Sequence, residues 1–310
     1  MKIAIAGAGA MGSRFGFMLH EAGEDVILID EWQEHIKQIG ENGLLVEKDG
    51  QSFQAEIPIF HPKEVAETKD LVIIFTKSMH LERMLKNISA VIGPETKILC
   101  LLNGVGHEAI LQQYVPLENI IMGVTILTSK LIGPGKISFA GGGLTEIQNF
   151  VDNEKAKEFT QRIVKLLNKT GLEVEYSDDV MYSIWRKACV NGAMNATCAL
   201  LDCNLAEFES VQPSGAIIRS IVREFVDAAN DRGTVLNEDD IVDYIINSAK
   251  AVGHHYPSMH QDLVQNKRLT EVDFLNGAVA RMAKEDGKEA PVNALIAQLI
   301  HAKEEIIQAK

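Results

Sequence analysis

The chain has 310 residues, of which 46% are hydrophobic and 24% charged, a mixture typical of an ordered globular protein with room for two domains. Its 30 basic and 43 acidic residues give a formal charge of −13, which repels nucleic-acid phosphates and anionic membrane surfaces, so we expect neither as a partner. We find no secretory signal, no apolar run of the roughly 20 residues that span a bilayer, and no CxxC pair, so we expect a cytoplasmic protein with reduced thiols.

From Lys2 to about Ser177, short β-rich apolar runs alternate with helical stretches. Runs that are apolar throughout are typical of strands buried on both faces, and their alternation with helices predicts a parallel sheet covered by helices. The runs are Ile3–Ala6, Val26–Ile29, Leu71–Phe75 and Lys97–Leu102. Two hairpins are also expected, one over residues 43–58 with its turn at Asp49-Gly50 and one turning at Gly133-Pro134-Gly135.

After Asp179 the strand runs vanish and helical periodicity continues to the end of the chain. Asp178 or Asp179 can cap a helix that runs to about Leu201. Further helices are expected over 214–231, 238–252, 273–284 and 292–307, the last with Pro291 near its first turn. We therefore expect an α/β domain over residues 1–177 and an all-α domain over residues 178–310.

Gly7-Ala8-Gly9-Ala10-Met11-Gly12 matches the GxGxxG pattern, directly after an apolar run and at the start of a helical stretch. The first glycine permits a tight turn, the second lets a pyrophosphate approach the backbone, and the third lets the helix pack on the strand. Free N–H groups at the helix N-terminus attract the anion. The pattern predicts a Rossmann-type dinucleotide-binding domain in which these six residues bind the cofactor, with an empty glycine-rich turn as the alternative.

Asp30 follows the second apolar run, close to the usual offset of about 20 residues from the glycines. A carboxylate there accepts both hydrogen bonds from the adenosine ribose, whereas a 2′-phosphate would meet a like charge at a cost of about 4 kcal/mol. Asp30 therefore predicts a preference for NADH over NADPH. The alternatives are that Asp30 caps a helix, or that Lys37 or Arg14 compensates the charge of a phosphate.

Lys187, Asn191 and Asn195 recur at intervals of four among mostly apolar or small residues. Steps of four place them along one helical face with a drift of about 40° per step. Burying asparagine costs free energy unless the amide is hydrogen-bonded. The stripe is either a ligand-binding face or a face satisfied by solvent or by the core. The same two interpretations, ligand binding or a purely structural role, apply to Ser258, Thr270 and Glu271, because each of these residues could simply begin a helix.

Five motifs together resemble the ketopantoate reductase (2-dehydropantoate 2-reductase) family over nearly the whole chain. The last two are far more specific than the glycine turn. The motifs are GAGAMG at 7–12, Thr76-Lys77, Asn103-Gly104-Val105-Gly106, Lys187-xxx-Asn191-xxx-Asn195, and SMHQD at 258–262 followed by RLTEVDFLNG at 268–277.

The resemblance implies NADPH-dependent reduction of ketopantoate to pantoate in pantothenate synthesis, in a cleft between a Rossmann domain and a helical domain. It implies that Lys187 is the general acid, which suits a reaction that leaves negative charge on a ketone oxygen. It further implies that Glu271 contacts the substrate and orients Lys187. Of the remaining residues, Asn191, Asn195 and Ser258 would bind the substrate, Lys77 would contact the nicotinamide end of the cofactor, and Asn103 would contact both.

The chain departs from the family pattern at two places. Asp30-Glu31 stands where family members usually carry a basic residue for the 2′-phosphate, so either NADPH or NADH is the cofactor and Asp30 favours NADH. His255 replaces a substrate-contacting asparagine, and it can still hydrogen-bond but has another shape and titrates near neutrality.

We therefore expect an oxidoreductase that acts on a small 2-keto acid, with ketopantoate as the leading substrate. The alternatives are a reductase of a different branched 2-keto acid, which His255 favours, and a nicotinamide-binding regulator without catalysis. We expect no metal site, because hydride transfer to a ketone needs no metal when a lysine supplies the proton. The helical domain is expected to bind the substrate, and its apolar stripes could be core or the seam of a homodimer.

Overall fold

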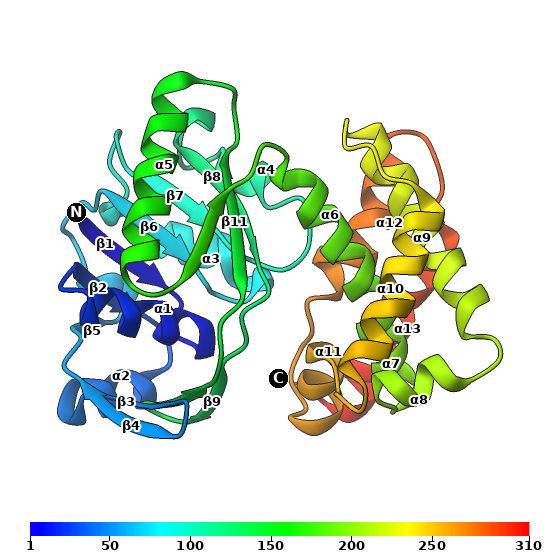
Figure 1. Cartoon of the computed structure of the whole chain (residues 1–310), viewed down its shortest axis with the longest axis horizontal. Helices are drawn as coiled ribbons and strands as arrows, with labels where there is room; N and C mark the ends of the chain where they lie inside the picture. Colours follow the sequence, from blue (N-terminus) through cyan, green and yellow to red (C-terminus); the bar gives the residue numbers. More distant parts are fainter. Residues whose placement is uncertain (310) are drawn as a thin grey trace. The chain divides into compact units, whose positions relative to one another are not determined.

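The computed structural model describes residues 1–309, which form two compact units. Unit 1 comprises residues 1–102 and 107–180, and unit 2 comprises residues 103–106 and the chain from residue 181 onward. Helix α6 (Val180–Val190) begins at the junction (Figure 1). None of the described helices is long and apolar enough to cross a bilayer. The predicted combination of an α/β part and an all-α part is confirmed.

Unit 1 is built on an eight-stranded sheet in the order β12-β11-β8-β7-β6-β1-β2-β5. Within the described residues, neighbouring strands run parallel except β8 and β11. The central strands are apolar and buried, as the continuous apolar runs predict. The strands are β1 (Lys2–Ala6), β2 (Asp25–Ile29), β5 (Ile59–Phe60), β6 (Leu71–Ile74), β7 (Lys97–Cys100), β8 (Ile120–Thr125), β11 (Leu144–Asn149) and β12 (Glu173–Tyr176).

The two predicted hairpins form a second sheet of four strands in the order β4-β3-β10-β9. Asp49 and Gly50 both have positive φ angles, as a two-residue hairpin turn requires. Figure 1 shows this sheet next to α1, which contacts all four of its strands. The strands are β3 (Leu44–Lys48), β4 (Gln51–Ala55), β9 (Lys130–Gly133) and β10 (Lys136–Phe139).

Buried Arg14 on α1 ties the helix to the second sheet and the loops beside it. Its Nη1 donates to the Thr128 carbonyl at 2.6 Å, its Nη2 donates to the Gly141 carbonyl at 2.8 Å, and its guanidinium lies over the Phe139 ring. Arg14 therefore stabilises the position of α1 against the second sheet.

The helices of unit 1 are α1 (Ala10–Glu21), α2 (Gln33–Asn42), α3 (Leu81–Asn87), α4 (Glu108–Leu111) and α5 (Glu154–Lys169).

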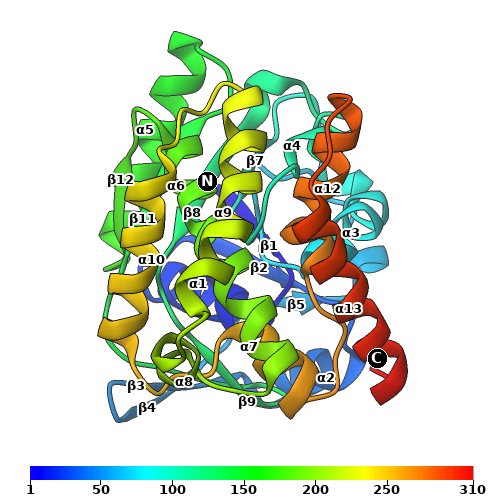
Figure 2. The ribbon, with the colours of Figure 1, turned by 90° about the vertical axis from the view of Figure 1, so that its right-hand side faces the viewer.

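Within the described residues, unit 2 contains helices and turns without a strand. Its core centres on α9, which contacts α8, α10, α12 and α13 and buries Phe225. Figure 2 shows α12 and α13 side by side. The helices are α7 (Ala196–Leu201), α8 (Leu205–Ser210), α9 (Ser214–Asp231), α10 (Glu238–Val252), α11 (Ser258–His260), α12 (Asn276–Glu285) and α13 (Pro291–Ile307).

Most of the helices expected in this half occur at the predicted positions, with Pro291 at the start of α13. The helix expected from Asp273 begins instead at Asn276, because Val272–Phe274 forms a separate 3₁₀ turn.

On the outside of α13, Leu295, Leu299 and Ile306 are exposed. The homodimer stays a prediction.

The helix expected to run to Leu201 is interrupted by a π-helical segment at Asn191–Asn195. In an α-helix a step of four residues overshoots a full turn by about 40°. The wider π-helix, with i→i+5 hydrogen bonds, has more residues per turn and removes this overshoot. Lys187, Asn191 and Asn195 therefore keep to one face better than a regular helix would allow.

A buried amide network supports this π-helical segment. Fully buried Asn276 donates from Nδ2 to the Gly192 carbonyl at 3.1 Å and to Asn293 Oδ1 at 2.8 Å. Asn293 in turn donates to the Ile221 carbonyl and to Glu224 on α9. Each buried donor thereby meets an acceptor, which offsets the cost of removing these groups from water.

We predict that Asn276→Ala lowers the free energy of unfolding by about 1–3 kcal/mol, because the Gly192 carbonyl and the Asn293 amide oxygen lose their donor. The matched change Asn247→Ala, at an exposed position on α10, should shift the free energy of unfolding by less than about 0.5 kcal/mol. Urea unfolding followed by circular dichroism measures both. Equal losses in the two variants would contradict a stabilising role for the network.

Candidate active site

The glycine-rich turn in unit 1 has the geometry that its three glycines predict. Gly7 has a φ of +97°, and a Cβ there would lie 2.4 Å from the Thr76 nitrogen. A Cβ on Gly12 would lie 1.9 Å from the Gly7 carbonyl oxygen. A Cβ on Gly9 would meet nothing within 4 Å. Gly7 and Gly12 are thus required by the fold, whereas the open space at Gly9 suits a ligand that approaches the backbone.

Helix α1 begins directly after this turn, with Gly9 at its N-cap position and no side-chain cap. The first N–H groups of a helix have no partner within the helix, and the helix dipole makes this end positive. An open glycine, uncapped donors and a positive helix end together fit the pyrophosphate of a dinucleotide. The residues present therefore match the cofactor that the motif implies.

Asp30 lies at the end of β2 and is hydrogen-bonded to the glycine-rich turn. Its Oδ2 accepts from the Ala8 N–H at 2.7 Å, and its Oδ1 accepts from the Trp32 N–H at 2.9 Å. Trp32, not Asp30, occupies the N-cap position of α2, so the helix-capping interpretation of Asp30 is wrong. Each carboxylate oxygen has a further lone pair, which leaves room for two ribose hydroxyls.

Glu31, next to Asp30 in the chain, adds a second negative charge. Glu31 pairs with Arg83 at 2.5 Å, and it also accepts from the Asn87 amide at 3.1 Å. Both terminal nitrogens of Arg14 are held by backbone carbonyls, as described above. Arg83 and Arg14 are therefore already paired with protein groups.

Unit 2 contains a small pocket. Five of the residues expected from the sequence line it, together with three that the sequence analysis did not single out. The expected five are Asn103, Asn191, Asn195, Ser258 and Glu271, and the additional three are Met259, Asp262 and Leu275.

Short, irregular helical pieces bring the polar residues of the pocket together. Asn195, the last residue of the π-helical segment, donates from Nδ2 to Ser258 Oγ at 3.2 Å. Ser258 is the first residue of α11, which continues into a second π-helical segment at Gln261–Gln265. π-Helical turns are rare and occur frequently at functional sites.

The segment that carries Asn103 is hydrogen-bonded to Phe274, which follows Glu271 in the chain. The Val105 N–H donates to the Phe274 carbonyl at 3.0 Å, and a Cβ on Gly104 would lie 2.2 Å from that same oxygen. Gly104, with a φ of +98°, therefore allows the close approach that places Asn103 at the pocket.

Lys187 lies in the last turn of α6 and is half-buried. Burial lowers the pKa of its ammonium group to about 8, while the negative charge of Glu271 acts in the opposite direction. A lysine with such a pKa is still mostly protonated at neutral pH and releases its proton more readily than a free lysine. This is the property that a proton donor needs.

Three of the residues expected at the substrate or the nicotinamide are not among those that line the pocket, and Lys187, described above, is one of them. Lys77 is exposed in unit 1, before a 3₁₀ turn at Ser78–His80. His255 is exposed in unit 2, and its backbone carbonyl accepts from the Leu205 N–H. Met259, Asp262 and Leu275 could have been found from the sequence, because they lie inside the motifs that carry the family resemblance.

His260, next to the pocket residue Met259 in the chain, has protein partners. Buried His260 lies with Nε2 2.9 Å from Asp202 Oδ1, and its ring stacks on Tyr256. Within residues 1–309 no cluster of three or more His, Cys, Asp or Glu side chains is arranged to hold a metal ion.

Known proteins resemble this chain over its full length. Residues 3–152 match the family described as ketopantoate reductase PanE/ApbA, and residues 179–304 match its C-terminal counterpart. A 2-dehydropantoate 2-reductase of Streptococcus pyogenes is 46% identical over 307 residues, with 99% of each chain covered. A 2-dehydropantoate 2-reductase of Lactococcus lactis is 43% identical over 314 residues, with 100% of each chain covered.

Among solved structures, the ternary complex of D-mandelate dehydrogenase with NADH and anilino(oxo)acetate is 44% identical, with a TM-score of 0.95 and 100% of each chain covered. The relatives thus share one fold and one broad chemistry but act on different acids by name. The chain belongs to the ketopantoate reductase family of oxidoreductases, with a Rossmann-type NAD(P)-binding domain.

Proposed function

We propose that the chain reduces a 2-keto acid branched at C3 to the 2-hydroxy acid with NADH, and that 2-dehydropantoate is its leading substrate. The observation that carries the proposal is the half-buried Lys187 with a lowered pKa, acting with Glu271 of the amide-lined pocket. Residues 1–177 would bind the dinucleotide and residues 178–310 the acid. The chain would work in the cytoplasm.

The polar residues expected from the sequence would have distinct roles in this chemistry. The cofactor, when bound at the glycine-rich turn, supplies a hydride to the keto carbon. Lys187 then gives its proton to the oxygen that gains negative charge, which converts the ketone into an alcohol. Asn191, Asn195 and Ser258 would hydrogen-bond the carboxylate and hydroxyl of the substrate. Glu271 would keep Lys187 charged and oriented.

The pocket supports recognition of a small, polar acid. Amide and hydroxyl groups from Asn103, Asn191, Asn195 and Ser258 can donate to a carboxylate, while Met259 and Leu275 offer apolar surface to a branched carbon chain. Lys77 and the amide of Asn103 would contact the nicotinamide end of the cofactor.

An acid with an aromatic group is the second candidate substrate. The 44% identity to D-mandelate dehydrogenase supports it, as does His255 at the place of the asparagine usual in the family. Comparing kcat/KM for 2-dehydropantoate, 2-ketoisovalerate and phenylglyoxylate separates the candidates. A higher value for phenylglyoxylate would replace the leading substrate, and micromolar NADH binding without turnover of any acid would favour a regulator.

We predict that kcat/KM with NADH exceeds that with NADPH by at least about tenfold, because a 2′-phosphate would meet the Asp30 carboxylate. The solved complex of D-mandelate dehydrogenase with NADH supports this choice. Asp30→Asn should reduce the ratio, since the amide keeps the shape of the side chain but loses the charge. Asp25→Asn, at the exposed start of β2, should leave the ratio unchanged. Equal use of both cofactors by the parent chain would contradict the role given to Asp30.

We predict that kcat of the reduction falls as the pH rises above about 8, because Lys187 then loses the proton that it donates. Glu271→Gln should move this fall to lower pH, since the carboxylate no longer raises the pKa of Lys187.

Lys187→Ala should lower kcat by roughly 10² to 10⁴ at neutral pH, the usual range for a general acid. Exposed Lys250→Ala is the control and should keep the parental profile. Parental turnover by Lys187→Ala would refute the assignment.

A further inference from the structure

His301 on α13 lies between two carboxylates of unit 2. Its Nδ1 is 2.8 Å from Glu304 Oε2, and its Nε2 is 3.1 Å from Asp273 Oδ1. A carboxylate can only accept hydrogen bonds, and a neutral imidazole has only one N–H. Both contacts are hydrogen bonds only when His301 carries two protons. The geometry therefore calls for the imidazolium form.

The two carboxylates hold both ends of the short segment Thr270–Phe274, which carries Glu271. Buried Glu304 accepts from the Thr270 N–H at 2.7 Å with its other oxygen, Oε1. Asp273 belongs to the segment itself. Protonated His301 thus closes a ring of hydrogen bonds that runs from Thr270 through Glu304 and His301 to Asp273, with Glu271 enclosed between its two ends.

A second part of the pocket rests on the same segment. Phe274 accepts the Val105 N–H, and the Gly104 backbone lies against the Phe274 carbonyl. A shift of this segment would therefore move Asn103 as well as Glu271. His301 itself is not among the residues that line the pocket.

We propose that His301 is a positioning residue, whose imidazolium form fixes the segment Thr270–Phe274 and thereby the Glu271 carboxylate, and whose deprotonation loosens both. The proposal rests on the proposed function in that Glu271 keeps Lys187 charged during the reduction. It adds that a residue outside the pocket holds Glu271 in place, and that this residue does so only while it is protonated.

The charges that face His301 favour its protonated form. Its nearest charged neighbours are Asp273 on the 3₁₀ turn and Glu304 on its own helix. From α12, Arg281 donates to the backbone carbonyl of Asp273. Burial lowers the pKa of His301, but the hydrogen bonds and charges of Glu304 and Asp273 outweigh burial, and the pKa is raised.

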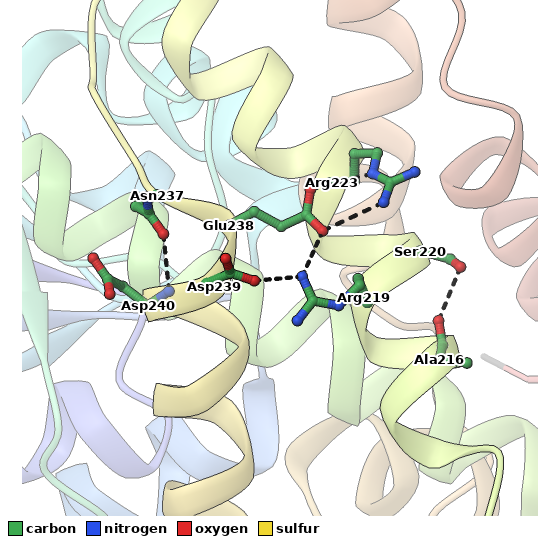
Figure 3. Close-up of polar contacts among 8 residues, drawn as sticks. All are labelled: Ala216, Arg219, Ser220, Arg223, Asn237, Glu238, Asp239 and Asp240. Atoms are coloured by element: carbon green, nitrogen blue, oxygen red, sulfur yellow. Dashed lines mark hydrogen bonds and ion pairs between the residues drawn. The ribbon is translucent and has the colours of Figure 1, made fainter.

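On α7 and α9, which also pack on α13, the following groups have other partners or surroundings. On α7 the only titratable side chain is buried Cys198, and Lys303 of α13 donates to the Ala199 carbonyl there. On α9, Glu224 caps the start of α13. Arg219 and Arg223 of α9 pair with the first turn of α10, at Glu238 and Asp239, as Figure 3 shows. Asp231 pairs with Lys288.

The sign of the pH effect follows from the raised pKa. At pH values below the raised pKa of His301, the imidazole carries two protons and the ring of hydrogen bonds is complete. As the pH rises through the pKa that His301 has in the folded chain, one of its two hydrogen bonds is lost. The segment Thr270–Phe274 should then become more mobile on the alkaline side.

Hydrogen exchange of the backbone amides in this segment tests the proposal without depending on activity. In the parent chain, protection of the Thr270 amide, corrected for the intrinsic effect of pH, should fall as His301 loses its proton. His301→Gln should show weak protection at every pH. His301→Arg, which stays charged and has several donors, should keep the protection at alkaline pH.

Steady-state assays supply the second readout. His301→Gln should lower kcat by roughly 10- to 100-fold with little change in the KM for NADH, because a small displacement of a catalytic group is costly. His301→Arg should restore most of kcat at neutral pH. His20→Gln, on α1 of unit 1, is the control and should match the parent chain.

Two results would overturn the proposal. One is pH-independent protection of the segment in the parent chain. The other is equal loss of protection in His301→Arg and His301→Gln, which would show that only the shape of the histidine matters. If the parent chain reduced no 2-keto acid while the exchange pattern held, the proposed function would fail and the positioning role would stand.

Discussion

Under the proposed function, the reaction depends on keeping one ammonium group charged where burial works against the charge. Burial lowers the pKa of Lys187, and the carboxylate of Glu271 is the charge that opposes this effect. The balance is set by the place of Glu271, and Glu271 lies on a short segment that has only a 3₁₀ turn of its own. Such a segment cannot fix a side chain by itself. It is held instead from α13, through the bond from Thr270 to Glu304.

The same dependence on outside support applies to the two π-helical segments. A π-helix replaces the regular i→i+4 hydrogen bonds with i→i+5 bonds, and here side-chain amides add further donors to its carbonyls. The Asn276 amide supplies one at Gly192, and the Asn266 amide supplies one at Gln261 at 2.6 Å. In both places an asparagine donates to a carbonyl at or near the start of a widened helix. The amides thus stabilise the irregular backbone that aligns Asn191, Asn195 and Ser258.

The sequence predicted the regular parts of the molecule well, because hydrophobic periodicity and turn residues report local structure. The apolar runs became strands of the parallel sheet, Asp49-Gly50 became a hairpin turn, and α9 and α10 occupy the ranges that their periodicity predicts. The roles of Gly7, Gly9 and Gly12 also followed from spacing, since each position imposes its own steric condition.

The irregular parts escaped prediction for physical reasons. Spacing of four among Lys187, Asn191 and Asn195 is compatible with α- and π-helices, and the amide that supports the π-helical segment comes from Asn276, 84 positions away from Gly192. The contact between His301 and Asp273 and the hydrogen bond from Thr270 to Glu304 likewise join residues about 30 positions apart, so no local pattern reveals them.

Asp30 illustrates why one departure from the family pattern is hard to reverse. Its carboxylate is the acceptor for the N–H groups of Ala8 and Trp32, so it helps to shape the glycine-rich turn as well as presenting lone pairs to a ribose. A basic residue in its place has no oxygen to accept either bond. Under the proposed function, the group that selects the cofactor without a 2′-phosphate also orders the turn that binds the pyrophosphate. A change of cofactor would therefore require rebuilding the turn, not only exchanging one charge for another.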